Sequence, residues 1–339
     1  MAGRDIILIG ASAGGVQTLA ELARHLPRDL PAAVFVVIHL APFSSSSMPA
    51  ILSRVGPLPA VHPRDGEPIV PGKIYVAPPD HHLVIEPERV RISRGPTENG
   101  HRPSVDVLFR TGAEVYGPRV VAVVLTGNLD DGTAGLAVVK KHRGVAVVQD
   151  PEEADYPGMP RSAIASVDVD HVLPLAGIAS LLADLVHQPV DDPQLPPGEE
   201  DAMPIKQELE LGEDREGRGV PSGLTCPDCG GSLFEREESG LIHFRCRTGH
   251  AYSPASLLAK QSETLEASLW AAVRALEENA ALAHRMERRM RQGRSRDLPV
   301  ETRYTRRAQE AERHADALRR ILMGDSETVR EEEASEAEG

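Results

Sequence analysis

The sequence predicts an α/β fold: a doubly wound, mostly parallel sheet with an antiparallel hairpin, followed by a small cysteine-bearing module and a C-terminal helical hairpin. Apolar, strand-like runs alternate with helical stretches from Asp5 to about residue 187. These runs are apolar on both faces, which is typical of a parallel sheet covered by helices on both sides. Beyond them, a proline- and acid-rich segment precedes two cysteine-containing pairs and two long helical patterns.

The elements of the first domain follow from this alternation. Strands are expected where the apolar runs lie, at 6–9, 33–40, 73–78, 119–127 and 144–150. Helices are expected between them, at 14–25, 104–116, 132–142 and 175–187. The segment HLVIEPERVRIS (82–93) alternates around a turn at Pro87–Arg89 and predicts the antiparallel hairpin.

The composition then changes four times along the chain. Residues 188–220 combine proline, glycine and acid with little hydrophobicity, which predicts a disordered acidic linker after the domain at 1–187. A cysteine-bearing module is expected at 221–252. A helical hairpin follows at 253–323, with Ser253 as its N-cap and Pro254 in the first turn, and these helices form either an antiparallel pair or a dimer-forming surface. Residues 324–339 are expected to be an acidic, disordered tail.

Charge and cysteine content exclude several classes of protein. The net charge of −14 argues against a general nucleic-acid binder, and it is concentrated in residues 190–220 (ten acids, three bases) and 325–339 (seven acids, one base). No apolar run approaches the roughly eighteen residues needed to span a bilayer, so no integral membrane protein is expected. The N-terminus lacks the features of a signal peptide. Three cysteines are too few for a disulfide framework, so the sequence predicts a cytoplasmic protein.

Polar residues follow three of the predicted strands. Ser12 follows the first, His39 closes the second, and Asp130 and Asp131 follow the strand at 119–127. In an open parallel sheet, ligands bind beyond the carboxyl ends of the strands. Serine, histidine and aspartate at one edge are the set needed for nucleophilic acyl transfer. Each residue alone also has a structural explanation, as a helix N-cap or a hydrogen-bonded histidine; the convergence of all three favours a hydrolase.

Other interpretations of GASAGG (10–15) are weaker. The segment lacks the GxGxxG pattern of dinucleotide-binding proteins and the lysine of a P-loop. It fits the GxSxG pattern of α/β-hydrolases. In those enzymes several strands precede the serine and the order along the chain is Ser, Asp, His, whereas here Ser12 follows the first strand and the order is Ser, His, Asp. An ordinary α/β-hydrolase is therefore not expected.

Six motifs in order give a more specific indication: IGASAGG, VVIHL, PGKIYVAPPDHHL, RPSVDVLF, VVLTGNLDDGTAG and YPGMPRSAI followed by VDHVLPL. Over about residues 4–187 the chain resembles the catalytic domain of the chemotaxis protein-glutamate methylesterases of the CheB type. The resemblance implies hydrolysis of glutamate γ-methyl esters on chemoreceptor helices with release of methanol, often with deamidation of receptor glutamines. It also implies Ser12 as nucleophile, His39 as base and Asp131, rather than Asp130, as the orienting acid. Backbone N–H groups of Ala13 and Asn128 would then hold the oxyanion.

The chain departs from the family pattern in three places. Ala13 stands where the family usually has threonine, and Asn128 and Leu129 stand where it usually has methionine and glycine. These changes bear on the shape of the substrate pocket. The best-known members begin with a phosphorylatable receiver domain, whereas this sequence starts within five residues of the first strand. We therefore expect no control by a receiver of its own.

The cysteine-bearing module pairs Cys226-x2-Cys229 with Cys246-x3-His250. Three cysteines and one histidine in two close pairs suit a tetrahedral zinc ribbon, with four protein ligands and no open position for catalysis. His243 is a competing fourth ligand. A redox CxxC and reduced core cysteines are the alternatives. The sequence thus predicts structural zinc, no cofactor for catalysis, and a docking or dimerising role for the module and its helices.

The function expected from these observations is a cytoplasmic serine esterase acting on methylated receptor glutamates. A receptor glutamine deamidase, an esterase for another protein and a non-catalytic signalling scaffold remain as alternatives. The expected partners are methylated chemoreceptor cytoplasmic helices, with a receptor methyltransferase or a separate response regulator as further candidates. A second copy of the chain, bound through the C-terminal helices, is also a candidate.

Overall fold

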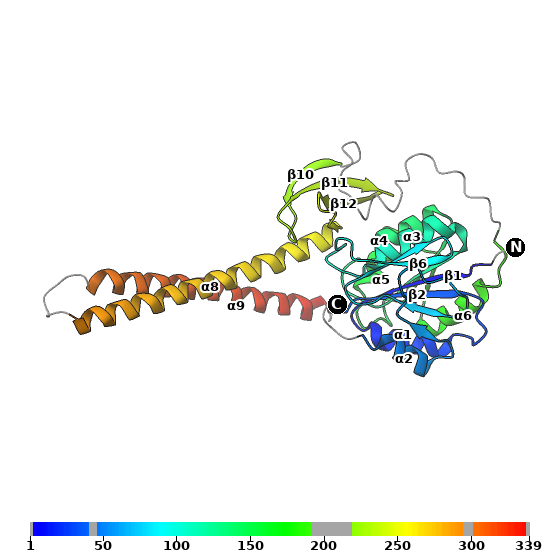
Figure 1. The fold of residues 1–339 in the computed structure, drawn as a ribbon, viewed down its shortest axis with the longest axis horizontal. Coiled ribbons are helices and arrows are strands. Elements are labelled where there is room, and N and C mark those ends of the chain that lie inside the picture. Colours follow the sequence, from blue (N-terminus) through cyan, green and yellow to red (C-terminus); the bar gives the residue numbers. More distant parts are fainter. Residues whose placement is uncertain (1–2, 41–45, 191–218, 294–300, 337–339) are drawn as a thin grey trace. The chain divides into compact units, whose positions relative to one another are not determined.

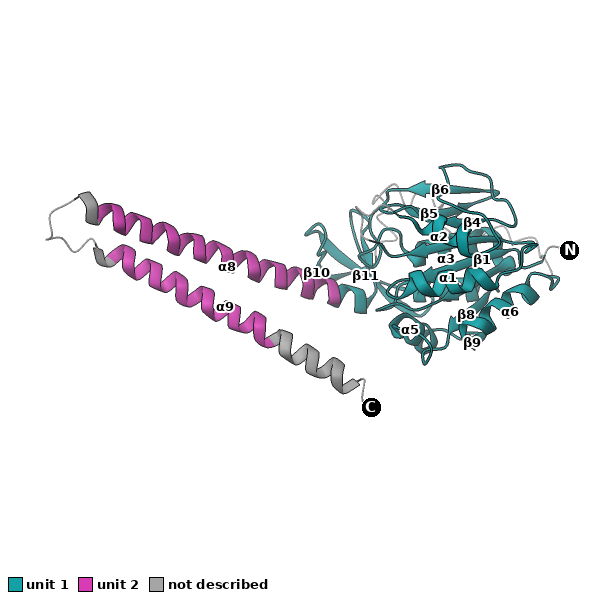
Figure 2. Ribbon diagram, turned by 90° about the horizontal axis from the view of Figure 1, so that it is seen from below, with its two compact units in different colours: residues 1–258 teal, residues 259–339 magenta. Residues whose placement is uncertain are grey.

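The structure is a computed structural model that describes residues 3–40, 46–190, 219–293 and 301–336. The chain forms two compact units, residues 1–258 and 259–339, shown in different colours in Figure 2. Most of the predicted linker at 188–220 lies outside the described residues, as do residues 337–339 of the predicted tail. None of the described helices is both long and apolar enough to cross a bilayer.

The first unit is built on a seven-stranded sheet in the order β3-β4-β2-β1-β7-β8-β9, with every neighbouring pair parallel. Its strands are β1 (Ile6–Ala11), β2 (Ala33–Ile38), β3 (Ala60–Val61), β4 (Ile74–Val76), β7 (Val120–Val124), β8 (Val145–Gln149) and β9 (His171–Leu173). The central strand β1 therefore lies between β2 and β7. An antiparallel hairpin, β5 (His82–Glu86) and β6 (Arg89–Ser93), forms a separate sheet. The predicted α/β class, with its parallel sheet and hairpin, is confirmed.

Helices cover both faces of the sheet (Figure 1). One face holds α1 (Gly15–His25), α2 (Met48–Val55) and α6 (Leu175–Leu185), and the other holds α3 (Val105–Tyr116), α4 (Thr133–Lys141) and α5 (Gly158–Ser166), with a short 3₁₀ turn η1 (Gly117–Arg119) after α3. Alternate strand residues separate the two cores: Ile7 and Ile9 of β1 pack with the first set of helices, while Ile6 and Leu8 pack with the second. Both cores are fully buried, which makes the sheet a rigid platform for its edges.

Four elements of the α/β part, apart from the short turn η1, were not predicted, namely α2, α5, β3 and β9. The two strands have only two and three residues, and Val172 in β9 is 41% exposed, so neither produces an apolar run. The two helices are short, and each has a proline close to its start. Proline is tolerated in a first helical turn but weakens a helical pattern when the sequence alone is considered.

The cysteine-bearing module belongs to the same compact unit as the α/β part. It is a four-stranded antiparallel sheet of β10 (Val220–Thr225), β11 (Ser232–Glu238), β12 (Leu241–Cys246) and β13 (Ala251–Tyr252). Its small core consists of Cys226, Leu233, Cys246, Tyr252 and Leu257. We refer to residues 220–252 as the ribbon.

The second unit consists of two helices, α8 (Pro254–Gly293), whose first turn belongs to the first unit, and α9 (Glu301–Glu336). Their pairing is antiparallel, because Glu277 forms an ion pair with Arg319 while His284 Nε2 lies 2.9 Å from Glu312 Oε1. Residues 324–336, expected as a disordered tail, are helical and continue α9. Five of these thirteen residues are glutamate, a strong helix former, and the sequence prediction gave too much weight to the charge of the segment.

Candidate active site

Ser12 leaves the central strand of the sheet at the start of a glycine turn. Its backbone N–H donates a hydrogen bond of 2.9 Å to the carbonyl of Thr126, which follows β7. The N-cap of α1 is Gly14, at φ 74°, and no side chain caps the helix. A left-handed conformation of this kind is easily reached only by glycine. Ser12 is therefore not the N-cap of α1, and its hydroxyl group is available for another partner.

Ser12, His39 and Asp131 form a continuous chain of hydrogen bonds. His39 Nδ1 lies 3.1 Å from Ser12 Oγ, and His39 Nε2 lies 2.8 Å from Asp131 Oδ2. The side chains of His39 and Asp131 are only 8% and 3% exposed. Because a carboxylate only accepts, Nε2 carries the proton in the neutral ring, and Nδ1 can then accept the proton of the serine hydroxyl. The structure thus brings the three predicted residues together, from the ends of β1, β2 and β7.

Asp131 is buried and surrounded by donors. Its Oδ1 accepts from Ser104 Oγ at 2.8 Å and Asn99 Nδ2 at 3.0 Å, and its Oδ2 accepts from the Val105 N–H at 2.7 Å. Burial by itself raises the pKa of this carboxyl, but the hydrogen bond and charge of His39, with the Val105 N–H, outweigh it and hold the pKa below its usual value. Asp131 is therefore an anion that fixes the orientation of the imidazole ring.

The neighbouring Asp130 does not contact His39. Burial raises its pKa, an effect opposed mainly by a hydrogen bond to Ser253. The N-cap of α4 is Gly132, at φ 96°, and no side chain caps that helix either. Neither aspartate serves as the helix cap that the sequence also allowed.

The loop after β7 closes tightly over the serine. A side chain at Gly127 would place its Cβ 2.1 Å from Met159 Sδ and 2.8 Å from the Cβ of Ser12. The Gly127 N–H donates to the Tyr156 carbonyl at 2.8 Å, which ties this loop to the one after β8. Leu129, at the position where glycine was expected from the resemblance, has a φ of 61° and is 42% exposed. The loop at Gly127 thus packs directly against Ser12, and the residue that follows Asn128 has a left-handed backbone that is unusual for leucine.

Four further residues of the site had no role assigned from the sequence. His101 stacks on His39 with ring centroids 3.8 Å apart. The fully buried His82 donates from Nε2 to the Pro96 carbonyl at 2.9 Å and accepts the Ser104 N–H at Nδ1. Asn99 and Ser104 contact Asp131, as described above. Ser104 and His82 lie in the RPSVDVLF and PDHHL motifs, so the motifs marked their segments without showing that they support the carboxylate.

A second cluster lies in the ribbon. The ligand atoms of Cys226, Cys229, Cys246 and His250 all lie within 4.8 Å of one another. Cys229 Sγ is 3.7 Å from Cys246 Sγ, and His250 Nδ1 is 3.6 and 3.5 Å from the sulfurs of Cys226 and Cys246. A zinc ion with sulfur at about 2.3 Å and nitrogen at about 2.0 Å requires edges of about 3.8 and 3.5 Å in a tetrahedron. The cluster could therefore hold a metal ion of this size. His243, the competing ligand, lies on β12 outside the cluster.

Comparisons with known proteins agree with this geometry. The family description CheB methylesterase matches residues 7–182, which include all three residues of the hydrogen-bonded chain. A Leptospira interrogans protein is 40% identical over 182 residues, which are 53% of this chain and 94% of that protein. Protein-glutamate methylesterase/protein-glutamine glutaminase 2 of Methanosarcina mazei is 36% identical over 191 residues, 54% of this chain and 52% of that protein.

A solved structure is similar as well. The Thermotoga maritima CheB methylesterase catalytic domain superposes with a TM-score of 0.52 at 34% sequence identity, and the match covers 55% of this chain and all of that domain. The ribbon and the C-terminal helices lie outside the region matched by the family description. The α/β part has both the sequence motifs and the fold of these relatives, and the chain belongs to the CheB methylesterase family.

Proposed function

We propose that this chain is a protein-glutamate methylesterase, a serine hydrolase that removes methyl esters from glutamate side chains of chemoreceptors and releases methanol in a chemotaxis-like signalling system. The single observation that carries the proposal is the buried hydrogen-bond chain from Ser12 through His39 to Asp131. The names of relatives, among them the Methanosarcina mazei protein, support the substrate class.

In the proposed mechanism, His39 Nδ1 takes the proton of the Ser12 hydroxyl while Oγ attacks the ester carbonyl. The anionic Asp131 stabilises the imidazolium ion through the Nε2–H that it already accepts. His39 then returns the proton to the departing methoxide, so that methanol leaves and the glutamyl ester of Ser12 remains. Water, deprotonated by the same nitrogen, cleaves this ester and restores the serine hydroxyl.

Two backbone N–H groups are proposed to stabilise the oxyanion. Within the described part of the chain, neither the Ala13 nor the Asn128 N–H donates a hydrogen bond to another protein group. The absence of a side chain at Gly127 lets the backbone of this loop approach Ser12 closely, because a Cβ there would lie 2.8 Å from the Cβ of Ser12. In well-studied enzymes, one such donor contributes about 3–4 kcal/mol to stabilisation of the transition state.

Deamidation is the second candidate function. Relatives named protein-glutamate methylesterase/protein-glutamine glutaminase carry both activities in their names. The same acyl-enzyme would form from a glutamine side chain if His39 protonated the departing amine rather than methoxide. A non-catalytic scaffold is less well supported, since the arrangement of Ser12, His39 and Asp131 leaves no structural role for the serine hydroxyl.

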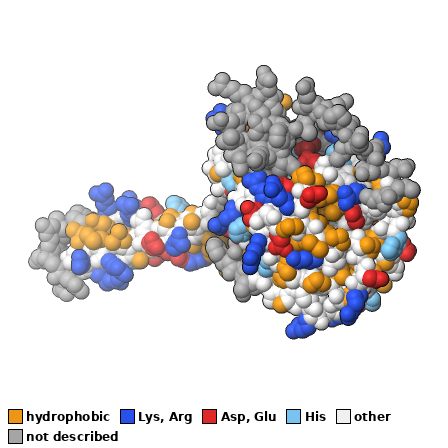
Figure 3. All heavy atoms as spheres, turned by 45° about the vertical axis from the view of Figure 1, so that its right-hand side comes forward, with side chains coloured by type: hydrophobic (Ala, Val, Ile, Leu, Met, Phe, Trp, Pro, Cys, Tyr) orange, Lys and Arg blue, Asp and Glu red, His pale blue; other side chains and the backbone are white. Residues whose placement is uncertain are grey.

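The remaining parts of the chain are proposed to organise the enzyme. We assign the ribbon, which the sequence analysis expected at 221–252, as a structural zinc module, with Cys226, Cys229, Cys246 and His250 as its ligands. We assign the C-terminal helices as a docking or dimerisation element. Exposed apolar side chains on α8, namely Leu258, Leu265, Trp270 and Leu282, support such a contact. The face of the molecule in Figure 3 carries acidic and basic side chains interspersed with hydrophobic ones, which suits protein partners better than nucleic acid. The candidate partners remain methylated receptor helices, a receptor methyltransferase and a separate response regulator. The proposed location of the protein is the cytoplasm.

The test is release of methanol from membranes that carry a methylated receptor, with ammonia from unmodified receptor measured in parallel. We expect Ser12→Ala to lower both rates by about 10⁴-fold or more, as loss of a nucleophile does elsewhere. Ser180→Ala is the matched control, because Ser180 is exposed and bonds only within its own helix. Methanol release that persists in Ser12→Ala would contradict the assigned nucleophile. If folded wild-type protein released no methanol, the result would favour another ester as the substrate, or a non-catalytic scaffold.

A further inference from the structure

Asn99 joins the candidate active site to the C-terminal part of the chain. Its Nδ2 donates to Asp131 Oδ1 at 3.0 Å and to Asp106 Oδ2 at 2.7 Å. Its Oδ1 accepts from the Ser253 N–H and from Ser256 Oγ, both at 2.9 Å. A carboxamide has two donor hydrogens and two acceptor lone pairs, so all four positions of Asn99 are used. The two donor hydrogens fix the carboxylates of Asp131 and Asp106 at the site. The two lone pairs accept from residues that follow the ribbon.

The donors on the C-terminal side belong to the first turn of α8. Ser256 N donates to Ser253 Oγ at 3.0 Å and Leu257 N donates to the Ser253 carbonyl at 2.9 Å, so Ser253 caps this helix as predicted. Both Ser253 and Ser256 are buried, at 8% and 2% exposure. Leu257 is part of the ribbon core, together with the ligands Cys226 and Cys246. The position of the two serines is therefore set by the folded ribbon.

The backbone around Asn99 is also attached to the metal-ligand cluster. Asn99 N donates to the Ala251 carbonyl at 2.8 Å, and Ala251 N donates to the Thr97 carbonyl at 3.2 Å. Ala251 directly follows the ligand His250. Thr97 Oγ1 donates to Asp228 Oδ2 at 2.6 Å, and Asp228 lies between the ligands Cys226 and Cys229. Residues 97–99 are thus hydrogen-bonded to both ligand-bearing loops of the ribbon.

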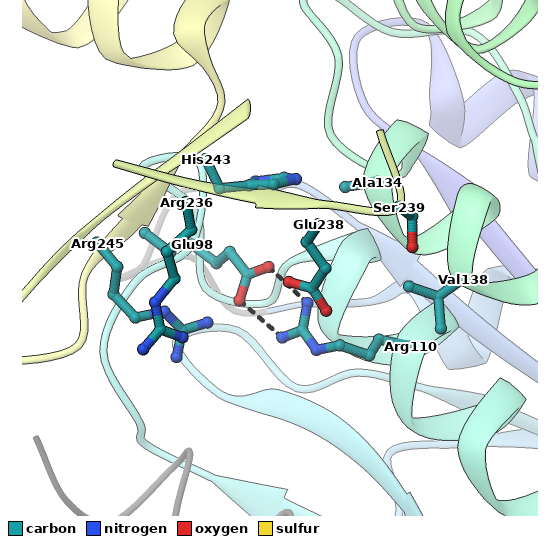
Figure 4. A pocket seen from close by; sticks show the side chains of 10 residues that line it. Glu98, Arg110, Ala134, Val138, Arg236, Glu238, Ser239, His243 and Arg245 are labelled. Carbon is teal, nitrogen blue, oxygen red and sulfur yellow. Dashed lines mark hydrogen bonds and ion pairs between the residues drawn. The ribbon is translucent and has the colours of Figure 1, made fainter. Parts of the chain in front are cut away.

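Charged groups reinforce the same contact (Figure 4). Glu98 forms two bonds of 2.9 Å with Arg110, and Arg236, His243 and Arg245 of the ribbon line the same pocket. Burial raises the pKa of Glu98, but the charges of Arg110 and Arg245 and the Arg110 hydrogen bonds outweigh it and hold the pKa at about 2. The carboxylate therefore stays charged, and part of its stabilisation comes from Arg245 on β12.

We propose that Asn99 is a positioning residue through which the metal-bound ribbon sets the activity of the triad; this rests on the proposed esterase function of Ser12. With the ribbon folded around its metal, Ser253 and Ser256 hold Asn99 Oδ1, and Nδ2 then fixes Asp131. Without the metal, the cluster and the first turn of α8 lose their order, and Asn99 loses two of its four partners. The metal thus controls esterase activity although it never contacts substrate.

The expected size of the effect follows from geometry. A misplacement of about 1 Å among catalytic groups costs on the order of 10²-fold in rate. When Asn99 is released, Asp131 still has Ser104 and Val105 as donors, although these bonds are looser, so we expect metal removal and Asn99→Ala to slow acylation of Ser12 by about 10- to 100-fold. Ser256→Ala removes one of the two bonds to Asn99 Oδ1 and should slow acylation by about 3- to 10-fold.

The test measures inactivation of the full-length protein by a fluorophosphonate, separating the maximal rate of Ser12 labelling from the affinity of the reagent. Asn99→Ala and Ser256→Ala should lower the maximal rate and leave the affinity unchanged, since Asn99 acts through Asp131. Ser268→Ala is the matched control, because its hydroxyl bonds only to Thr264 on the exposed part of the same helix. A maximal rate in Ser256→Ala equal to that of wild type would overturn the proposal.

The decisive comparison repeats this measurement after chelation, with metal content measured by mass spectrometry. Metal removal should slow labelling of wild-type protein, and Ser256→Ala should then have no additional effect. Equal effects of Ser256→Ala with and without metal would show that the serine and the metal act independently, and would overturn the proposal. Retained hydrogen-exchange protection of β1 and β7 excludes general unfolding as the cause.

A second readout does not depend on Ser12 reactivity or on the receptor. The Val105 amide, which donates to Asp131 Oδ2, should exchange faster after metal removal and in Ser256→Ala. Unchanged Val105 exchange in both would overturn the coupling even if Ser12 were unreactive. Conversely, metal-dependent labelling without methanol release from receptors would refute the proposed substrate and leave the coupling intact.

Discussion

The α/β part and the ribbon are organised by different means within one compact unit. In the α/β part, two extensive apolar clusters bury both faces of the parallel sheet and present Ser12, His39 and Asp131 at one edge. The core of the ribbon contains five buried residues, and two of these are candidate metal ligands. A large core can hold chemical groups in place without help, whereas a core of this size needs a metal ion or a neighbouring surface. The difference predicts that different perturbations unfold the two regions, even though the ribbon acts on the triad through Asn99.

The largest expected effect is that of metal removal on the ribbon. Binding of structural zinc by small modules contributes about 10–16 kcal/mol, so chelation should unfold residues 220–252 while the parallel sheet persists. Hydrogen exchange followed by mass spectrometry would show lost protection in β10–β13 and retained protection in β7. Full protection of the ribbon after verified removal of the metal would mean that docking on the α/β part is sufficient to hold it.

Substitution of Asp131, the carboxylate of the triad, tests the α/β part. Both oxygens of Asp131 accept hydrogen bonds, so Asp131→Asn must turn its NH₂ group toward a donor and disturb the His39 tautomer. We expect ester hydrolysis to fall by about 10⁴-fold, the loss known for this change in a serine protease. Turnover of a soluble ester by Asp131→Asn and Asp130→Asn gives the comparison. A larger loss in Asp130→Asn would reverse the assignment.

The contact between the two regions should be sensitive to acid. The pKa of Glu98 is about 2 in the folded protein, below its ordinary value, because Arg110 and Arg245 outweigh the effect of burial. A carboxyl with a lowered folded pKa stabilises the fold above its unfolded pKa of about 4.3, and this stability is lost as the pH falls toward 2.

Glu98→Gln should therefore cost about 3 kcal/mol at pH 7, since it breaks a buried ion pair. The free energy of unfolding of this variant should also decline less than that of wild type between pH 5 and pH 3. Urea unfolding at each pH measures both quantities. Parallel pH profiles for the two proteins would show that Glu98 is not the titrating group.

The smallest effect is expected at the loop beside Ser12. Leu129 has a φ of 61°, a conformation that costs a residue other than glycine roughly 1–2 kcal/mol. Leu129→Gly should raise the free energy of unfolding by up to about 1 kcal/mol, whereas Leu129→Ala keeps the strain and should not. Thermal unfolding of the two variants decides the point. Stabilisation by both would indicate that the exposed leucine side chain, and not its backbone, is unfavourable.

Long apolar runs made the α/β part predictable from sequence. Strands β1, β2, β7 and β8 are buried throughout, so each left a continuous pattern, and polar residues just past such strands identified Ser12, His39 and Asp131. Motif resemblance was still needed to choose Asp131 over Asp130, because spacing along one loop does not show which side chain reaches the histidine.

The residues outside the motifs that support the candidate active site could not be predicted from apolar runs. Asn99 lies in an Asn-Gly turn, and it reaches Ser253 only because the ribbon folds back onto the α/β part. In the sequence, the predicted linker lies between the catalytic domain and the ribbon, and such a linker is typical of modules that fold independently. Hydrogen bonds between residues about 150 positions apart leave no periodic signal in either segment.

The order of strands in the sheet also has a consequence for biosynthesis. Strand β1 is made first, yet one of its two neighbours, β7, lies at residues Val120–Val124. During synthesis the ribosome must therefore release more than a third of the chain before the centre of the sheet can close. Until then the edge of Ile6–Ala11 that faces β7 remains unpaired, and the open edge of an apolar strand is the kind of surface on which nascent chains aggregate or recruit chaperones.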